Sequence, residues 1–204
     1  MIFGERCGGV RPCLGVIAIA GLALGACEAS VKLDYASATG VASVAGAEAV
    51  PVSVTGLDLR TEDRDRISTK KGVLRSPVKA QNDVADLVRQ AVETELKAEG
   101  FPSRRGGVGI VAELEEFESK YILLLFNNTA EAKVSFTLKV KGANGITRYS
   151  RLYSGVGRES YGLAETGDTA KLALERALAA AMQEVIGDRG LSQAILAAGA
   201  MTGR

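Results

Sequence analysis

The stretch Val134-Ser135-Phe136-Thr137-Leu138-Lys139-Val140, followed by Asn144-Gly145, decides the class of fold. Apolar and polar side chains alternate along it, which is the pattern of a strand with one buried face and one face in water. Asn-Gly is a strong signal for a tight hairpin turn, so a second strand is expected over 146–157, where Tyr149 and Tyr153 lie. The sequence therefore predicts an antiparallel sheet built around this hairpin.

Helical patterns flank the predicted sheet strands. In 82–99, apolar residues recur at helical spacing behind an Asn82-Asp83 cap, and Gly100 ends the segment. A second apolar stripe runs through 168–186, and a short last helix is expected near 191–198. Further strands are predicted over 50–59, 110–115 and 121–126. This order predicts an α+β fold, with a mostly antiparallel sheet and two main helices packed on one face.

The N-terminal segment has the order of a secretory signal peptide, with two arginines, an apolar run from Leu14 to Leu24, and then small residues. The apolar run is too short to span a bilayer, which needs about 20 residues. Leu24-Gly25-Ala26-Cys27 resembles the lipobox of bacterial lipoproteins. That resemblance implies cleavage between Ala26 and Cys27 and a lipid on the Cys27 thiol. An ordinary signal peptide with a chance cysteine is the alternative.

We expect three parts in the chain. They are a lipoprotein signal peptide at 1–26, an acylated cysteine and tether at 27–49, and a periplasmic α+β domain at 50–204. Residues 36–49 are rich in Ala, Ser, Gly and Val, and a flexible coil of that length spans roughly 20 Å. Residues 61–81 are charged and without periodicity, which predicts a long solvated loop.

Composition argues against several classes of function. The mature part carries 23 basic and 23 acidic residues, so it has no electrostatic reason to bind nucleic acid. The chain contains no histidine, and its three cysteines are Cys7, Cys13 and Cys27. A Ser-His-Asp site, a Cys-His site and a Cys-rich metal site are therefore all ruled out in the mature chain. We expect no cofactor, no metal and no enzymatic activity.

Three patterns resemble catalytic or ligand motifs but lack their companions. Two Ser-x-x-Lys motifs, at Ser68–Lys71 and Ser76–Lys79, occur without Ser-Asp-Asn or Lys-Thr-Gly. Gly155-Val156-Gly157 resembles the start of a phosphate-binding loop, but Ser160 stands where the next glycine belongs. An acid–base pair would have to come from the glutamates of one segment: Glu113, Glu115, Glu116 and Glu118. Glu113 and Glu115 alternate with apolar residues, which instead predicts that they lie on a water-facing sheet surface.

Several stretches together resemble the YajG-type periplasmic lipoproteins of Gram-negative bacteria. They are the lipobox, Leu33-Asp34-Tyr35, Asp58-Leu59-Arg60 at the end of the first strand, and a helix opening at Asn82-Asp83-Val84 and closing at Gly100-Phe101. The resemblance implies a fold and a compartment but no reaction. In lipoproteins, an Asp after the acylated cysteine tends to hold the protein in the inner membrane. Glu28 stands there, so we expect the periplasmic face of the outer membrane.

The expected function is that of a non-catalytic lipoprotein, anchored to the membrane through its lipid, which binds an envelope protein or another envelope component. One alternative is an accessory lipoprotein of an envelope lipid or polysaccharide transport system, and a carboxylate-dependent enzyme is the least favoured. A candidate interaction surface lies in 121–126, because one face of a strand hides only three of its six apolar residues. We expect Ile122, Leu124 and Phe126 to face the core, and a second layer, a partner or lipid to contact Tyr121, Leu123 and Leu125.

Overall fold

The structure is a computed structural model, and it describes residues 29–38, 40–61, 63–68, 77–122, 128–142, 144–161 and 167–202. In chain order, the elements are β1 (Ala29–Val31), the 3-10 helix η1 (Ala47–Ala49), β2 (Val52–Asp58), β3 (Val78–Ala80), α1 (Val84–Ala98), β4 (Val108–Ile122), β5 (Asn128–Lys141), β6 (Thr147–Tyr161), α2 (Gly167–Ile186) and α3 (Arg189–Thr202).

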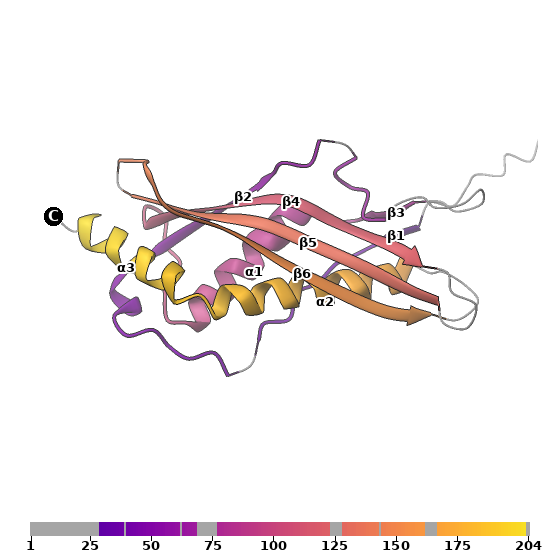
Figure 1. Cartoon of the computed structure of the whole chain (residues 1–204). Coiled ribbons are helices and arrows are strands. Elements are labelled where there is room, and N and C mark those ends of the chain that lie inside the picture. Colours follow the sequence, from indigo (N-terminus) through magenta and orange to yellow (C-terminus); the bar gives the residue numbers. More distant parts are fainter. Residues whose placement is uncertain are drawn as a thin grey trace, which may run out of the picture.

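A four-stranded sheet in the order β2–β4–β5–β6 forms one layer, and the helices form the other (Figure 1). The pairs β4–β5 and β5–β6 are antiparallel, which confirms the predicted α+β class and its mostly antiparallel sheet. The pair β2–β4 is parallel, a feature that the sequence did not predict. It arises because the chain between these strands contains α1, and parallel neighbours need a long crossover of this kind.

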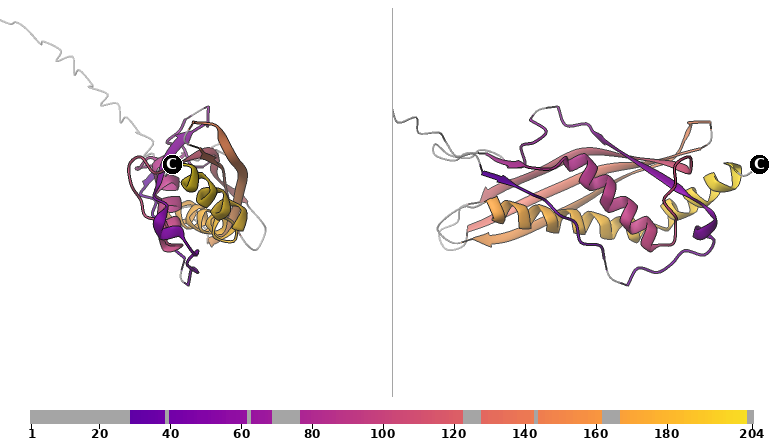
Figure 2. Two further views of the ribbon diagram at one scale, coloured as in Figure 1. Left: turned by 90° about the vertical axis from the view of Figure 1, so that its left-hand side faces the viewer. Right: turned by 180° about the vertical axis from the view of Figure 1, so that it is seen from behind.

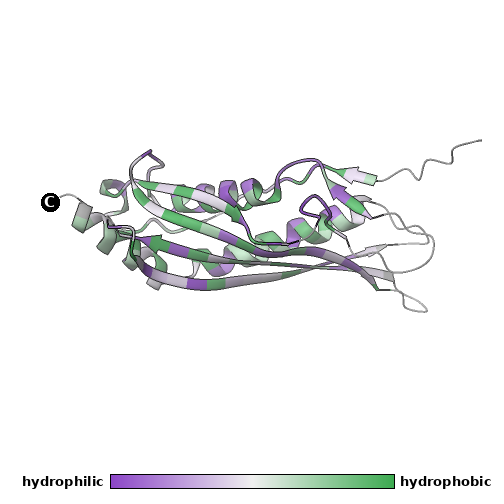
Figure 3. Ribbon diagram, turned by 90° about the horizontal axis from the view of Figure 1, so that it is seen from above, coloured by the Kyte–Doolittle hydropathy of each residue, from purple (hydrophilic) through white to green (hydrophobic). Residues whose placement is uncertain are grey.

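The face of the sheet opposite the helices is open, and hydrophilic and hydrophobic residues alternate along its strands (Figure 3). Ion pairs cross the central strands on this face, with 2.8 Å between Lys139 and Glu113 and 2.6 Å between Lys133 and Glu116. Partly exposed pairs of this kind add little stability. They do keep the open face hydrated, as the alternation predicts.

Helix α1 begins and ends where the sequence signals lie. The Asp83 carboxylate accepts hydrogen bonds from the backbone N–H groups of Ala85 at 2.8 Å and Asp86 at 3.1 Å. Gly100 follows the helix with φ at +104°, a left-handed conformation that glycine adopts without strain. Phe101 is then fully buried. The predicted helix is confirmed, and its apolar stripe lies in the core: Val84, Leu87, Val88, Ala91, Val92 and Leu96.

A β-bulge in β4 changes which residues face the core. The pairing with β5 shifts between Leu114 and Glu116, so Glu115 is an extra residue in the strand. Beyond it, Tyr121 is half-buried and packs against the core, whereas Ile122 is 38% exposed. The predicted orientation of these two residues is therefore wrong, because one inserted residue exchanges the two faces of a strand. The remaining residues of this prediction lie outside the described part of the chain: Leu123, Leu124, Leu125 and Phe126.

Helix α2 packs against β6 at backbone distance. A Cβ atom on Gly157 would lie 2.0 Å from the carbonyl oxygen of Ala173, and one on Gly155 would lie 2.1 Å from that of Ala177. Both alanines are fully buried. The Gly155-Val156-Gly157 sequence therefore lets a helix approach the sheet, which explains its two glycines without a phosphate ligand.

The N-terminal segment forms a strap (residues 29–38 and 40–46) that runs along the helical layer from β1 to η1 (Figure 2). Leu33 is 1% exposed, and Ala47, just beyond the strap, is fully buried. Asn82 binds both backbone groups of Leu33, accepting from its N–H at 3.0 Å and donating to its carbonyl at 3.1 Å. The flexible coil expected over 36–49 is wrong at Ala47, because this side chain is buried in the core.

Two buried glutamates of the helical layer hold the rest of the strap. The Glu95 carboxylate accepts hydrogen bonds from the Tyr35 hydroxyl and from the Ala38 N–H, the latter at 2.9 Å. The backbone carbonyl of Glu99 accepts from Val44 N–H at 2.8 Å. The strap is thus bonded to α1 and its C-terminal turn over most of its length.

The segment 61–81 contains folded structure that its composition did not predict. Ile67 is fully buried, and Val78 is 4% exposed in β3, which pairs in parallel with β1. Ser68 accepts a hydrogen bond from Val78 N–H at 2.8 Å through its Oγ atom. The prediction of a solvated loop is wrong at these positions, because two apolar side chains close the end of the core. Glu62 and residues 69–76 lie outside the described part.

Candidate functional site

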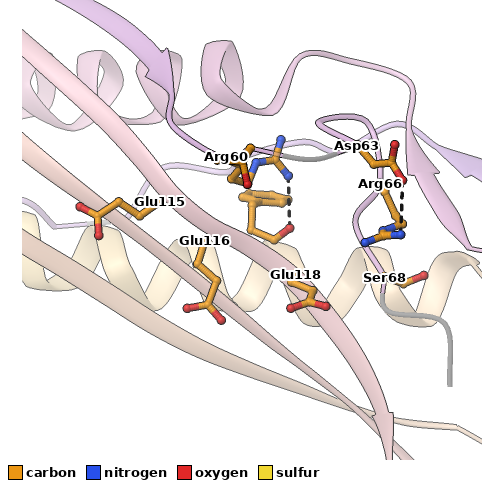
Figure 4. Close-up of a pocket in the computed structure, with 9 residues that line it drawn as sticks. Arg60, Asp63, Arg66, Ser68, Glu115, Glu116 and Glu118 are labelled. Carbon is orange, nitrogen blue, oxygen red and sulfur yellow. Dashed lines mark hydrogen bonds and ion pairs between the residues drawn. The ribbon is translucent and has the colours of Figure 1, made fainter.

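A polar cleft of about 260 Å³ lies where residues 60–68 pass over the bulged part of β4 (Figure 4). Arg60 is its most buried cation, and its Nη2 atom lies 2.8 Å from the Asp58 carboxylate. Burial acts to raise the pKa of Asp58, but hydrogen bonds and the charge of Arg60 outweigh it and lower that pKa. The charges of the two side chains neutralise each other. Arg60 also donates to the backbone carbonyl of Phe117 in β4 and so fixes the start of this segment to that strand.

The glutamates of β4 do not converge on a reaction site. In Figure 4, Glu116 and Glu118 extend to the side of the strand away from Arg60 and the Asp63–Arg66 pair. Each carboxylate has its own partner: Glu115 accepts from Thr137, Glu116 pairs with Lys133, and Glu118 pairs with Lys120. Glu115 is exposed, as the alternation predicts, and none of the three is arranged with another as an acid–base pair.

A second, mainly apolar pocket of about 300 Å³ lies where the strap, the end of α1 and the start of α3 meet. We call it the Glu99 pocket. Its apolar lining includes Val44, Ile186 and Leu196, and its polar groups include Glu99, Ser192 and Gln193. Glu99 and Ser192 are 4% and 7% exposed, whereas Gln193 is exposed at the rim. The pocket thus combines an apolar wall with one buried carboxyl group.

The carboxyl group of Glu99 is only partly ionised at neutral pH. Burial raises the pKa of Glu99 to about 7, although the Ser192 hydroxyl donates to its Oε2 atom at 3.3 Å and acts in the opposite direction. The nearby carboxylates of Glu95 and Asp188 raise the pKa further. At neutral pH, Glu99 can therefore either donate or accept a hydrogen bond, which few surface carboxyl groups can do.

The neighbouring carboxylate of Asp188 fixes the geometry between α2 and α3. Its Oδ1 atom accepts from Gly190 N–H at 2.8 Å and caps α3. Its Oδ2 atom accepts from the hydroxyls of Tyr149 and Tyr153, the latter at 2.7 Å, and from Arg151 at 2.8 Å. Burial acts to raise the pKa of Asp188, but the tyrosine hydroxyls and the cap lower it to about 2. This fixed carboxylate positions α3, and with it the pocket residue Ser192.

Most residues that the sequence predicts as functional lie outside the described part of the chain: Ala26, Cys27, Leu123 and Leu125. Tyr121 is described, and it packs against the core. The sequence missed Glu99 and Asp188. The signal for Asp188 was available, since an Asp before Arg189-Gly190-Leu191 is a typical helix N-cap.

The described ranges lack two kinds of feature. Groups of three or more Asp and Glu side chains close enough to hold a metal ion do not occur there. Among the described helices, none combines the length and the apolar character that crossing a bilayer requires.

The family model described as uncharacterized lipoprotein, Lipoprotein_16, matches residues 37–196. The chain belongs to this family. The match extends from the strap through most of α3, so it includes the sheet, the helical layer and the Glu99 pocket. It confirms the resemblance to YajG-type lipoproteins that the sequence stretches suggested.

One of the similar solved structures shows the same fold as this Lipoprotein_16 chain. Protein XCC0632 from Xanthomonas campestris, of family DUF330, has 15% sequence identity and a TM-score of 0.57, covering 78% of this chain and 92% of its own. A minor lipoprotein from Acinetobacter baumannii has 13% identity and a TM-score of 0.42, covering 70% of this chain and 92% of its own. None of the curated proteins is similar enough to match the chain. At these identities, the XCC0632 likeness concerns the fold alone.

Proposed function

We propose that this lipoprotein is anchored by an acylated Cys27 at the periplasmic face of the outer membrane, and that its domain binds an envelope protein without catalysing a reaction. The single observation that supports binding is the Glu99 pocket. It presents an apolar wall beside a carboxyl group with a pKa of about 7. Such a site suits an apolar side chain that carries or adjoins a hydrogen-bond donor.

The size and position of the pocket favour a protein partner over a transported lipid. At about 300 Å³, it is at the lower limit of ligand sites and suits one side chain rather than an acyl chain. A lipid-transport role would require a cavity between sheet and helices. In the described residues, that space is filled by fully buried core side chains such as Leu114, Phe136 and Leu178.

Anchoring depends on one thiol, because Cys27 is the only cysteine of the mature chain. Replacing Cys27 by serine is expected to abolish acylation and leave the unprocessed precursor. Metabolic labelling with a fatty acid measures this, and equal label on both proteins contradicts the proposal. Fractionation of the same wild-type cells is expected to place the protein with outer-membrane markers, since Glu28 rather than Asp follows the cysteine.

Binding at the Glu99 pocket can be tested by photo-crosslinking in the cell envelope. We expect a crosslinking amino acid at Gln193, which is exposed at the pocket rim, to give one discrete adduct. The matched control is Thr55, which is exposed on β2. A second change, Leu196→Asp, should reduce the Gln193 adduct because it places a charge on the apolar wall.

The contrast between the two crosslinking positions decides the outcome. The same adduct from Thr55, or an adduct from Gln193 that Leu196→Asp leaves unchanged, would show that the pocket is not the binding site. Circular dichroism of the purified Leu196→Asp protein checks that the domain is still folded.

A further inference from the structure

The connection between the proposed anchor and the folded domain is very short. Ala29, the first residue of β1, is two residues from Cys27. Two extended residues span at most about 7 Å. If Cys27 carries lipid, as the proposed function requires, the part of the domain that contains β1 must therefore lie at the membrane surface.

Strand β1 is bonded firmly to the domain, so it does not act as additional tether. Gln81 donates to the Val31 carbonyl at 2.9 Å through its backbone N–H, and to the Ser30 carbonyl at 3.2 Å through its side chain. Val31 is 8% exposed and lies against the first residue of α2, Gly167. Releasing β1 would expose Val31 and break its pairing with β3.

The domain is elongated, and β1 lies at one of its two ends (Figure 1). The same end contains β3, the last residues of β4 and the first turn of α2. The hairpin between β5 and β6 and the C-terminal α3 lie at the opposite end in Figure 1 and in the right-hand view of Figure 2. Because β4 has 15 residues, it extends roughly 50 Å between these ends.

We infer that the β1–β3 end of the domain rests on the phospholipid headgroups, with β4 standing away from the membrane and α3 directed into the periplasm. The described surface at this end suits a polar headgroup layer. Its cations are paired with acids, at 3.1 Å for Lys79 and Asp65 and at 2.7 Å for Arg158 and Glu131. Ile122, at the end of β4, is 38% exposed. The lipid supplies the affinity, and the short connection supplies the orientation.

The orientation can be measured on the acylated protein in vesicles of phosphatidylethanolamine and phosphatidylglycerol. Since the mature chain has no other cysteine, a fluorophore can be attached to Lys120→Cys at the near end or to Asn144→Cys in the far hairpin. In the sheet, Lys120 lies opposite Glu131 of β5. Glu131 lies roughly 35 Å along that strand from Lys141 at the far end. A nitroxide on the lipid headgroups should quench the first fluorophore several-fold more strongly than the second.

A linker variant tests whether the short connection is the cause. Inserting about sixteen Gly and Ser residues after Glu28 adds a coil of roughly 22 Å. This change should leave flotation with the vesicles intact and remove most of the difference between the two labels. Equal quenching of both labels without the linker, or an undiminished difference with it, would overturn the inference.

The proposed anchoring and the inferred orientation fail in distinguishable ways. Flotation of the protein with vesicles, and its loss in Cys27→Ser, reports anchoring alone. Quenching is read only on floated protein, so a floated domain with the wrong label quenched contradicts the orientation while the anchoring stands.

Discussion

Replacing Gly157 by alanine is expected to destabilise the domain by about 3 kcal/mol, the upper part of the range for overpacked cores. The added Cβ atom would lie 2.0 Å from the carbonyl oxygen of Ala173 and 2.5 Å from the backbone nitrogen of Ala177. Both are backbone atoms of α2, so no side chain can rotate away. The helix itself must move from β6, and fully buried contacts such as Leu174 and Leu178 must open with it.

Urea unfolding measures this loss, and Gly109→Ala is the matched control. Gly109 also lies in a strand of the same sheet, but its Cβ atom would meet only the Cβ atom of Lys141 at 3.7 Å, an ordinary contact. Alanine there should be neutral or stabilise the domain by up to about 1 kcal/mol through the unfolded state. Equal effects of the two substitutions would show that α2 does not pack against Gly157 at backbone distance.

Replacing Asp188 by alanine is expected to cost about 3 kcal/mol as well. The substitution removes the cap of α3 and leaves the buried Tyr153 hydroxyl without its charged acceptor. Arg151→Ala is the control, because the Arg151 side chain is 53% exposed and its ion pair with Asp188 should contribute less than about 1 kcal/mol. Denaturant titration of both variants compares the two losses, and a larger loss for Arg151→Ala would contradict this account of the site.

The pKa of Asp188 predicts how acid weakens the domain. A folded pKa of about 2, below the usual value near 3.9, means that this carboxylate contributes its full stability above about pH 4. The contribution, up to about 2.5 kcal/mol, is lost as the pH falls toward 2. Asp188→Asn should therefore be less stable than the wild type at pH 6, and the difference should shrink below pH 4. A difference that is constant with pH would contradict the pKa.

Local signals predicted the helices and the hairpin because their determinants are close in sequence. The Asp83 cap, the apolar stripe behind it and Gly100 all belong to the segment that forms α1. Asn144-Gly145 likewise marks the turn of the β5–β6 hairpin directly. The bulge at Glu115 has no such marker, since it depends on the pairing of β4 with β5. Its effect is large. The strand predicted at 110–115 continues to Ile122, and the core-facing positions exchange along it.

Long-range contacts explain the other differences. A strap rich in small residues has the composition of a linker, but distant contacts make it part of the domain: its bonds to Asn82, Glu95 and Glu99, its pairing with β3 and the burial of Leu33. The Glu99 pocket was not predictable for the same reason, because its lining comes from the strap, the end of α1 and the start of α3. Glu99 itself resembles any acidic residue near the end of an exposed helix until its burial is known.

The strap also determines how the domain responds to mechanical tension. Once the N-terminus is fixed in a membrane, a force that drags the domain away acts along β1 and the residues that follow it. The parallel pairing with β3 and the two hydrogen bonds between Leu33 and Asn82 would be loaded together, in shear, instead of opening one after another. Traction on the proposed anchor would thereby be transmitted into the start of α1 and the core, so the domain should resist it without first unfolding at its N-terminus.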